Sequence, residues 1–507
     1  MSIAKSYSAQ LIGLQSEIVT IEVDISHGLH AFSVVGLGDR AVEESKDRIA
    51  AAIKNTGYTS PKQKNQKVVI SLAPADVRKE GPSFDLAMAL TYLKATSDID
   101  FNSDKKIFLG ELSLEGKVRR VSGLLLIVCQ ARAHGFTEAF VPYENASEVS
   151  LAQGIDIYVV SSLKEVIAHV TGTKKCEPLP ALTSIPIPEP PPAINVSLIR
   201  GNETAKRGLE IAAAGAHNVI MCGPPGTGKT MLAQSFSSIL PPLSYEQSVE
   251  VTGIHSAARV LKEGMLVYPP FRAPHHTASY PSIVGGGGFP KPGEITLAHR
   301  GVLFLDEFPE FSREVIEALR QPLEERKITI SRARGVVTFP AQCILIASMN
   351  PCPCGKGKDN GCTCVPHTLE IYNRKMSGPI MDRLDVWLNV HKIDYEKLAQ
   401  KRSVAETSAD VRKRVMAARM RQSTRFKFHK IAKCYNGEMS AGDIEICIQM
   451  SDGARSLLTS CAKKFELSGR AFHRVIKVAQ TIADLGEKEV IQEEHILEAL
   501  QYRQKSS

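Results

Sequence analysis

The chain has 507 residues, of which 43% are hydrophobic, and carries a formal net charge of +8. This length exceeds what a single hydrophobic core supports, so two to four domains are expected. No apolar run approaches the ~20 residues that span a bilayer, and the N-terminus lacks the pattern of a signal peptide. We therefore expect a cytoplasmic protein without a membrane partner, in which the cysteines do not form a disulfide framework.

Residues 1–175 alternate strand-like and helix-like segments. The strand-like segments are β-branched and alternate in polarity, whereas the helix-like ones place apolar residues at helical spacing. Strands are expected over residues 16–26, 67–74 and within 106–121, and helices over 39–57 and 84–96. The pattern predicts a mixed α/β domain.

A proline-rich segment, residues 176–196, follows this region. Such a segment does not run as a helix or a central strand, so we interpret it as a semi-rigid linker. Beyond it, residues 197–395 alternate strands and helices in the manner of a parallel-sheet α/β core. Residues 396–507 show only helical periodicity, which predicts a C-terminal helical domain.

The segment GPPGTGKT matches the phosphate-binding pattern G-x-x-x-x-G-K-[ST] and lies between a predicted strand and a predicted helix. Its glycines let backbone N–H groups turn toward phosphates, and the helix N-terminus adds its dipole. Lys229 is expected to reach the β- and γ-phosphates, and Thr230 to coordinate Mg²⁺. The candidate nucleotide-binding residues are Gly223, Pro224, Pro225, Gly226, Thr227, Gly228, Lys229 and Thr230.

Two further buried strands end in polar residues. Residues 301–311, GVLFLDEFPEF, place Asp306 and Glu307 at the end of one strand. The first carboxylate is expected to hold Mg²⁺ and the second to orient the attacking water. Residues 341–350 end in Asn350, whose amide can contact the γ-phosphate or the water.

The segment between the phosphate loop and Asp306 contains the adjacent residues His275 and His276 and a glycine run before Lys291. Adjacent histidines seldom project to one metal, so a mobile loop carrying Lys291 is the preferred interpretation. Residues 326–341 predict a β-hairpin with Arg332 and Arg334 near its turn. Basic loop tips can track a phosphate backbone, although a plain surface hairpin is the alternative.

A basic stretch without acidic residues lies between residues 411 and 437. It is either a solvated helix face or a surface for nucleic acid or a neighbouring subunit. The residues concerned are Arg412, Lys413, Arg414, Arg419, Arg421, Arg425, Lys427, Lys430 and Lys433.

In this order the motifs resemble an AAA+ ATPase, closest to the magnesium-chelatase-like clade that also holds the MCM helicases. By resemblance, Lys229 and Thr230 are Walker A residues, Asp306 and Glu307 are Walker B residues, and Asn350 is sensor 1. The resemblance also implies that residues 326–341 form the pre-sensor hairpin.

Two arginines complete the AAA+ resemblance. Arg383, in SGPIMDRLDVW, takes the place of the arginine finger, which acts on nucleotide bound by the adjacent subunit. Arg470, in LSGRAFHRV, falls at the sensor 2 position. The resemblance therefore implies ATP, Mg²⁺ and a homo-oligomer in the form of a hexameric ring.

The N-terminal region resembles the Lon-protease-like domain that heads proteins of the ComM/YifB family. Ser83 falls at the nucleophile position, but residues 124–127, Leu-Leu-Leu-Ile, occupy the place of the activating lysine. Because a hydroxyl without a base is a poor nucleophile, we expect a non-proteolytic domain.

The whole chain resembles this family: a Lon-like domain over 1–175, a linker over 176–196, an AAA+ core over 197–395 and a helical lid over 396–507. The resemblance implies an ATP-driven motor on single-stranded and branched DNA that carries out branch migration during natural transformation. A magnesium-chelatase-like ATPase subunit and an AAA+ unfoldase or protease are the alternatives.

The stretch MNPCPCGKGKDNGCTCVP, which begins at residue 349, holds two Cys-x-Cys pairs. The pairs are Cys352 with Cys354 and Cys362 with Cys364. Four thiolates satisfy tetrahedral Zn²⁺, although the spacing is tighter than the usual Cys-x₂₋₄-Cys. A structural zinc site is predicted, with a reducible disulfide pair or free thiols as alternatives.

Overall fold

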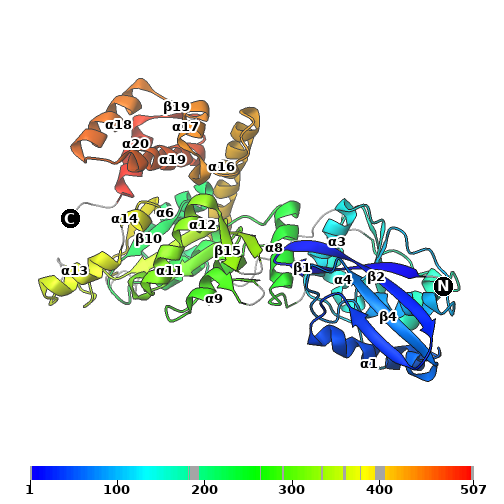
Figure 1. Cartoon of the computed structure of the whole chain (residues 1–507). Coiled ribbons are helices and arrows are strands. Elements are labelled where there is room, and N and C mark those ends of the chain that lie inside the picture. Colours follow the sequence, from blue (N-terminus) through cyan, green and yellow to red (C-terminus); the bar gives the residue numbers. More distant parts are fainter. Residues whose placement is uncertain are drawn as a thin grey trace. The chain divides into compact units, whose positions relative to one another are not determined.

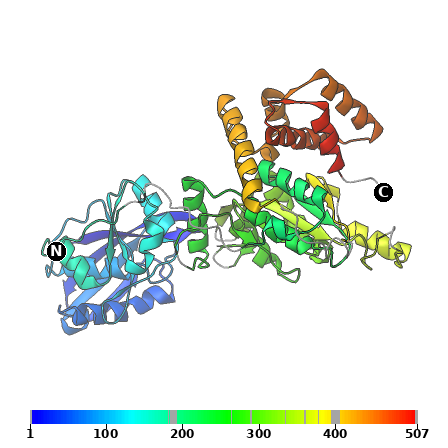
Figure 2. The ribbon, with the colours of Figure 1, turned by 180° about the vertical axis from the view of Figure 1, so that it is seen from behind.

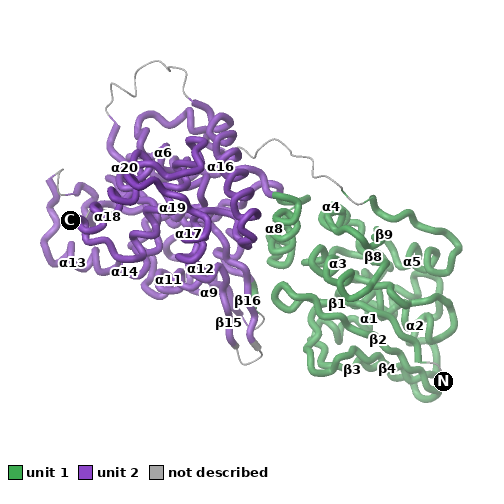
Figure 3. Tube along the Cα trace, turned by 90° about the horizontal axis from the view of Figure 1, so that it is seen from above, with its two compact units in different colours: residues 1–186, 244–266, 288–291 green, residues 187–243, 267–287, 292–507 purple. Residues whose placement is uncertain are grey.

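The computed structural model describes residues 3–180, 182, 193–262, 264–287, 290–332, 335–357, 361–376, 378–393 and 406–503. The chain forms two compact units, drawn in different colours in Figure 3. The first comprises residues 1–186, 244–266 and 288–291, and the second comprises residues 187–243, 267–287 and 292–507. Most of the predicted linker lies outside the described residues.

The first unit is built on a seven-stranded mixed sheet, parts of which are drawn in blue in Figure 1. Its strands, in spatial order, are β3 (Ala31–Val35), β4 (Gln66–Ala73), β2 (Gln15–His27), β1 (Ala4–Ile12), β5 (Lys106–Phe108), β8 (Glu138–Pro142) and β9 (Asp156–Val160). β2 runs antiparallel to both β1 and β4, and the other neighbours are parallel. β6 (Glu111–Leu112) and β7 (Val118–Arg119) form a separate short pair.

Side chains alternate between two apolar cores because successive residues of a strand point to opposite faces. Phe108 and Phe140 belong to the core that includes α1 (Arg40–Asn55), α2 (Asp85–Ala95) and α5 (Leu163–Val170). Their strand neighbours Ile107, Leu109 and Ala139 belong to the core that includes α3 (Leu124–Ala133). The helices and strands expected from the sequence of this region are confirmed.

The helix α8 (Tyr245–Ala257) belongs to the first unit, although it lies between the phosphate loop and Asp306 in the sequence. Gly253 faces Leu126 of α3, where a Cβ atom would clash. The Ser256 hydroxyl accepts a hydrogen bond from the Gly123 N–H at 2.8 Å and donates one to Glu148 at 2.8 Å. Burial raises the pKa of the Glu148 carboxyl. The first unit therefore recruits a helix from a distant part of the chain.

The second unit contains a five-stranded parallel sheet, which confirms the predicted α/β core. Its strands, in spatial order, are β11 (Phe271–Arg272), β14 (Val302–Leu305), β17 (Ile344–Met349), β10 (Val219–Cys222) and β18 (Val386–Asn389). The principal helices of this core are α6 (Glu203–Gly215), α7 (Lys229–Ile239), α11 (Arg313–Ala318), α12 (Arg320–Glu325), α13 (Pro366–Lys375) and α14 (Gly378–Met381). Because the strands are parallel, β10, β14 and β17 end at one edge of the sheet.

The predicted hairpin is present as β15 (Lys327–Arg332) and β16 (Gly335–Pro340), paired antiparallel. Arg334 and the side chain of Arg332 lie outside the described residues. Lys291 opens β13 (Lys291–Pro292) and is exposed to solvent. The predicted roles of Arg332 and Arg334 therefore stay predictions.

The C-terminal region contains α16 (Ser408–Phe428), α17 (Ala441–Cys447), α18 (Asp452–Lys464), α19 (Gly469–Leu485) and α20 (Glu493–Gln501). The expectation of a purely helical pattern was incomplete, because β19 (Gln449–Met450) pairs with β20 (Val490–Ile491). Strands of two residues are too short to show a periodicity.

Among the described residues, no helix combines the length and the apolar character needed to cross a bilayer.

The basic stretch lies mainly on α16, the long orange helix in Figure 2. Arg412 donates to the Ser238 carbonyl at 3.0 Å, and Arg419 donates to the Ala213 carbonyl at 2.7 Å. Arg425 pairs with Asp484, which is fully buried. These arginines tie α16 to α7, α6 and α19, so part of the basic stretch serves packing within the unit.

Candidate nucleotide site

The phosphate loop joins the end of β10 to the start of α7. Gly226 and Gly228 have positive φ angles of 74° and 87°, which L-residues with side chains rarely adopt. A Cβ atom at Gly223 would clash with the Val390 carbonyl. The Thr227 hydroxyl closes the turn by donating to the Pro224 carbonyl at 2.9 Å. The loop geometry thus depends on its glycines and leaves the N-terminus of α7 at the sheet edge.

Lys229 lies at the centre of this edge. Its Nζ donates to the carbonyls of Gly223 and Pro224 at 2.7 and 2.9 Å, and to Asn350 Oδ1 at 3.1 Å. Burial lowers the pKa of the Lys229 ammonium, while the charge of Asp306 opposes that shift. The ammonium group is therefore held between the loop and the end of β17, where it can meet an anionic ligand.

Asp306 accepts hydrogen bonds from two hydroxyl groups on neighbouring elements. Thr230 Oγ1 donates to Asp306 Oδ2 at 2.9 Å, and Ser348 Oγ donates to Oδ1. Oxygen ligands from one carboxylate and a hydroxyl are the type that Mg²⁺ accepts beside substrate phosphates. The structure thus brings Thr230 and Asp306 together in a manner that fits Mg²⁺. Ser348 was not predicted, although a hydroxyl in a buried strand two residues before Asn350 is a recognisable signal.

Glu307 adopts a positive φ of 52° and lies with the phosphate-loop residues at the same edge of the sheet. Its Oε2 lies 3.4 Å from Nδ1 of His276. The preceding residue, His275, instead shares a hydrogen bond with the Thr277 hydroxyl. The two adjacent histidines therefore have different partners, and the contact of His276 with Glu307 was not predicted.

A cavity of about 380 Å³ lies at this edge of the sheet. Its lining contains most of the predicted nucleotide-binding residues together with the Walker B and sensor 1 candidates. The lining residues are Pro225, Gly226, Thr227, Gly228, Lys229, Thr230, Met231, Asp306, Glu307, Ser348, Met349 and Asn350.

Arg383 and Arg470 are not among the residues that line this cavity. Both contact one carboxylate instead: Glu324 of α12 pairs with Arg383 and lies 3.5 Å from Arg470. Arg474 lies in the same region and donates to the Met381 carbonyl at 3.2 Å. Within one chain, the structure brings the two predicted arginines to each other but not to the phosphate loop.

The parallel sheet, the phosphate loop and the carboxylates at the strand ends define an AAA+ P-loop ATPase. The family model described as magnesium chelatase, subunit ChlI, matches residues 195–398. Two further models of the same subunit match residues 21–145 and, for its C-terminal part, 405–503. ATP and Mg²⁺ are the ligands that this class implies.

The chain is 40% identical to YifB of Salmonella typhimurium over 99% of this chain and 97% of that protein. It is 39% identical to competence protein ComM of Haemophilus influenzae over 99% of this chain and 98% of that protein. The chain therefore belongs to the ComM/YifB family, as its motifs predicted. A more distant relative is DNA replication licensing factor mcm2 of Xenopus tropicalis, 26% identical over 37% of this chain and 20% of that protein.

Proposed function

We propose that the protein is a ring-forming DNA motor that uses ATP hydrolysis to move branched DNA during recombination of incoming single strands. The observation that carries the proposal is the joining of Lys229 to Asn350 and of Thr230 to Asp306 at one sheet edge. The similarity to a protein named for competence supports natural transformation as the process. The similarity to a replication licensing factor supports DNA as the substrate of the motor.

Each residue at the sheet edge has a distinct task in phosphoryl transfer to water. The ammonium of Lys229 contacts the β- and γ-phosphates, and Asn350 fixes the γ-phosphate or the attacking water. Glu307 accepts a hydrogen bond from that water and orients it for in-line attack. Thr230 and Asp306 would hold Mg²⁺, which would neutralise part of the phosphate charge during hydrolysis.

The positions of Arg383 and Arg470 support assembly into a ring, which we propose to be a hexamer. A cation on the γ-phosphate accelerates hydrolysis strongly, and neither arginine lines the cavity of its own chain. In the ring, Arg383 and Arg470 leave Glu324 and contact nucleotide at the subunit interface. In the isolated chain, before the ring forms, Glu324 holds both arginine side chains.

We propose that Lys291 and the hairpin arginines Arg332 and Arg334 contact the DNA backbone in the ring channel. Contacts of Lys and Arg with phosphate are independent of sequence, as a translocating motor requires, and they weaken with salt. We place this activity in the cytoplasm.

The Lon-like unit is proposed to be a scaffold rather than a protease. The residues at the position of the activating lysine lie on the apolar side of α3, where Leu124, Leu125 and Ile127 are buried. An apolar helix face cannot deprotonate Ser83, which disfavours the protease alternative. The remaining alternative is a magnesium-chelatase-like subunit that responds to a porphyrin-binding partner.

The proposal is tested by measuring ATPase and strand-displacement activity on forked and three-way DNA at low salt. We expect DNA to stimulate ATP hydrolysis by the wild type. Lys229→Ala should abolish nucleotide binding, whereas Glu307→Gln should retain binding and lose turnover. If the wild type neither binds these DNAs nor displaces a strand, the motor function is excluded. Cleavage of casein by the wild type would instead establish a protease.

A further inference from the structure

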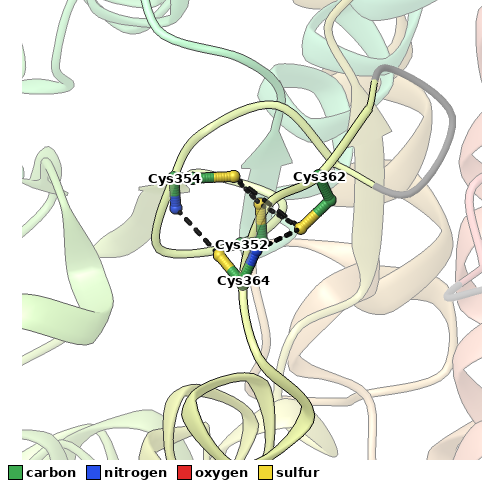
Figure 4. Close-up of side chains that lie close together, drawn as sticks. All are labelled: Cys352, Cys354, Cys362 and Cys364. Carbon is green, nitrogen blue, oxygen red and sulfur yellow. Dashed lines mark hydrogen bonds between the residues drawn. The ribbon is translucent and has the colours of Figure 1, made fainter.

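The four cysteines of the two Cys-x-Cys pairs converge on one point, as Figure 4 shows. Their Sγ atoms all lie within 4.8 Å of one another. The Cys352 and Cys354 sulfurs are 3.2 Å apart, and Cys362 lies 3.6 Å from Cys352 and 3.7 Å from Cys354. Two chain segments separated in sequence therefore deliver four thiols to one small volume.

These separations fit the edges of a tetrahedron around one metal ion. A Zn–S distance of about 2.3 Å places the sulfurs of a tetrathiolate zinc centre about 3.8 Å apart. A disulfide would require an S–S distance of about 2.05 Å, well below the separations found here. The geometry favours four metal ligands over two oxidised pairs.

Backbone N–H groups point at three of the sulfurs. The Gly357 N–H donates to Cys352 Sγ at 3.2 Å, the Cys354 N–H to Cys364 Sγ at 3.3 Å, and the Cys364 N–H to Cys362 Sγ at 3.4 Å. Such donors stabilise the negative charge of thiolates and fix the orientation of metal ligands. Gly357 reaches this position with a positive φ of 79°.

The cluster is also connected to the nucleotide site. Cys352 follows Asn350 by two residues, and Cys364 precedes α13, whose Tyr372 hydroxyl donates to the Asn350 carbonyl at 2.9 Å. At Gly355, a Cβ atom would lie 2.7 Å from Cδ of Pro225 in the phosphate loop. The cysteine loop thus contacts the phosphate loop. It begins directly after Asn350 and leads into α13, which contacts the Asn350 carbonyl.

We propose that Cys352, Cys354, Cys362 and Cys364 bind one structural Zn²⁺ that fixes Asn350 and Pro225 for nucleotide binding. Binding displaces the four thiol protons to solvent and leaves a centre with all four positions filled by protein. A closed tetrathiolate site has no position for substrate, so the ion is structural. The bracing of Asn350 rests on the proposed ATPase function, whereas the zinc site itself does not.

The zinc site is tested by metal analysis of the full-length protein purified without added metal. We expect about one zinc per chain in the wild type. The Cys352→Ser, Cys354→Ser variant should lose the metal, whereas the matched Cys176→Ser, Cys461→Ser variant should retain it. Cobalt added to metal-stripped wild type should give the visible absorption of a tetrahedral tetrathiolate. Absence of zinc from the wild type, with no uptake of zinc or cobalt by the reduced chain, would overturn the proposal.

The bracing is tested by the affinity for ATP·Mg²⁺, measured by calorimetry before and after chelation of the zinc. We expect affinity to fall about 10-fold on chelation and to return when zinc is added back. An unchanged affinity in zinc-depleted protein would contradict the bracing while leaving the zinc site intact. A wild type that holds zinc but binds no nucleotide would contradict the proposed ATPase function instead.

Discussion

Lys229 and Asn350 are joined by a hydrogen bond of 3.1 Å although 121 residues separate them in the sequence. Lys229 opens α7, whereas Asn350 follows β17, the strand beside β10 in the sheet. The bond therefore connects the phosphate loop to the residue proposed to sense the γ-phosphate. The Lys229 ammonium, which is proposed to contact the phosphates, is thus tied to the end of β17.

Replacing Asn350 with alanine should slow ATP hydrolysis about 100-fold, because one oriented polar group at the reacting phosphate is lost. Nucleotide binding should persist, since Lys229 and the loop N–H groups remain. Single-turnover hydrolysis and nucleotide affinity, measured on the same preparation, separate the two effects. Asn373→Ala, on the exposed side of α13, is the matched control, and an equal loss in both variants would contradict the role of Asn350.

Ser348→Ala should raise the Mg²⁺ concentration needed for half-maximal ATPase activity about 10-fold. The Ser348 hydroxyl donates to Asp306, and removal of such a partner loosens the orientation of a metal-binding carboxylate. The maximal rate at saturating Mg²⁺ should change little. Ser237→Ala removes a hydroxyl that bonds only within α7 and should leave the Mg²⁺ titration unchanged.

His276→Ala should lower turnover about 10-fold without changing nucleotide affinity, because Nδ1 of His276 lies 3.4 Å from the Glu307 carboxylate. His276→Gln should restore part of the rate, and His275→Ala is the adjacent control. In a Glu307→Gln background the histidine change should have almost no further effect, since the partner is gone. Additive losses in the double variant would mean that His276 acts elsewhere.

The sequence was sufficient to locate the residues whose position follows from one segment. Asp306, Glu307 and Asn350 each end a buried apolar strand, so their place at a sheet edge could be predicted. Ser348 and His276 could not be assigned partners, because the spatial order β11-β14-β17-β10-β18 differs from the chain order.

Contacts between segments that are distant in the sequence could not be predicted either. The helix α8 packs against α3 of the first unit because Gly253 has no side chain and leaves room for Leu126. The arginines of α16 gave the same charge pattern whether they face solvent or the carbonyls of α6 and α7. Such contacts depend on three-dimensional proximity that no local periodicity encodes.

Ser256→Ala should destabilise the first unit by about 1–3 kcal/mol, because the buried Gly123 N–H and Glu148 carboxyl each lose a partner. The effect should be confined to the amides of α3, α8 and α4 (Ala146–Val149), where hydrogen exchange accelerates. Ser150→Ala removes only a local hydroxyl contact and should leave this exchange unaltered. A uniform acceleration across both units would contradict a local role.

The free energy of unfolding of the first unit should fall as the pH rises from about 4 to 6, because of the buried carboxyl of Asp85. Burial raises the pKa of its carboxyl to about 6, in spite of the hydrogen bond from Arg48 at 2.9 Å. Because this folded-state pKa exceeds the value of about 3.9 expected for an unfolded chain, the folded unit holds the extra proton throughout that interval. Each unit of pH then lowers the free energy of unfolding by up to about 1.4 kcal/mol, and the loss levels off above pH 6.

Calorimetric melting of the first unit between pH 4 and 7 checks this behaviour in Asp85→Asn, which should flatten the decline. Asp47 provides a control of opposite sign, because the hydrogen bond from Lys62 lowers the pKa of its carboxyl. Asp47 therefore contributes stability that is lost only as the pH falls below about 4, so Asp47→Asn should leave the decline between pH 4 and 7 unchanged. If Asp47→Asn flattens the decline as much as Asp85→Asn does, the pH dependence arises from the altered net charge rather than from the burial of Asp85.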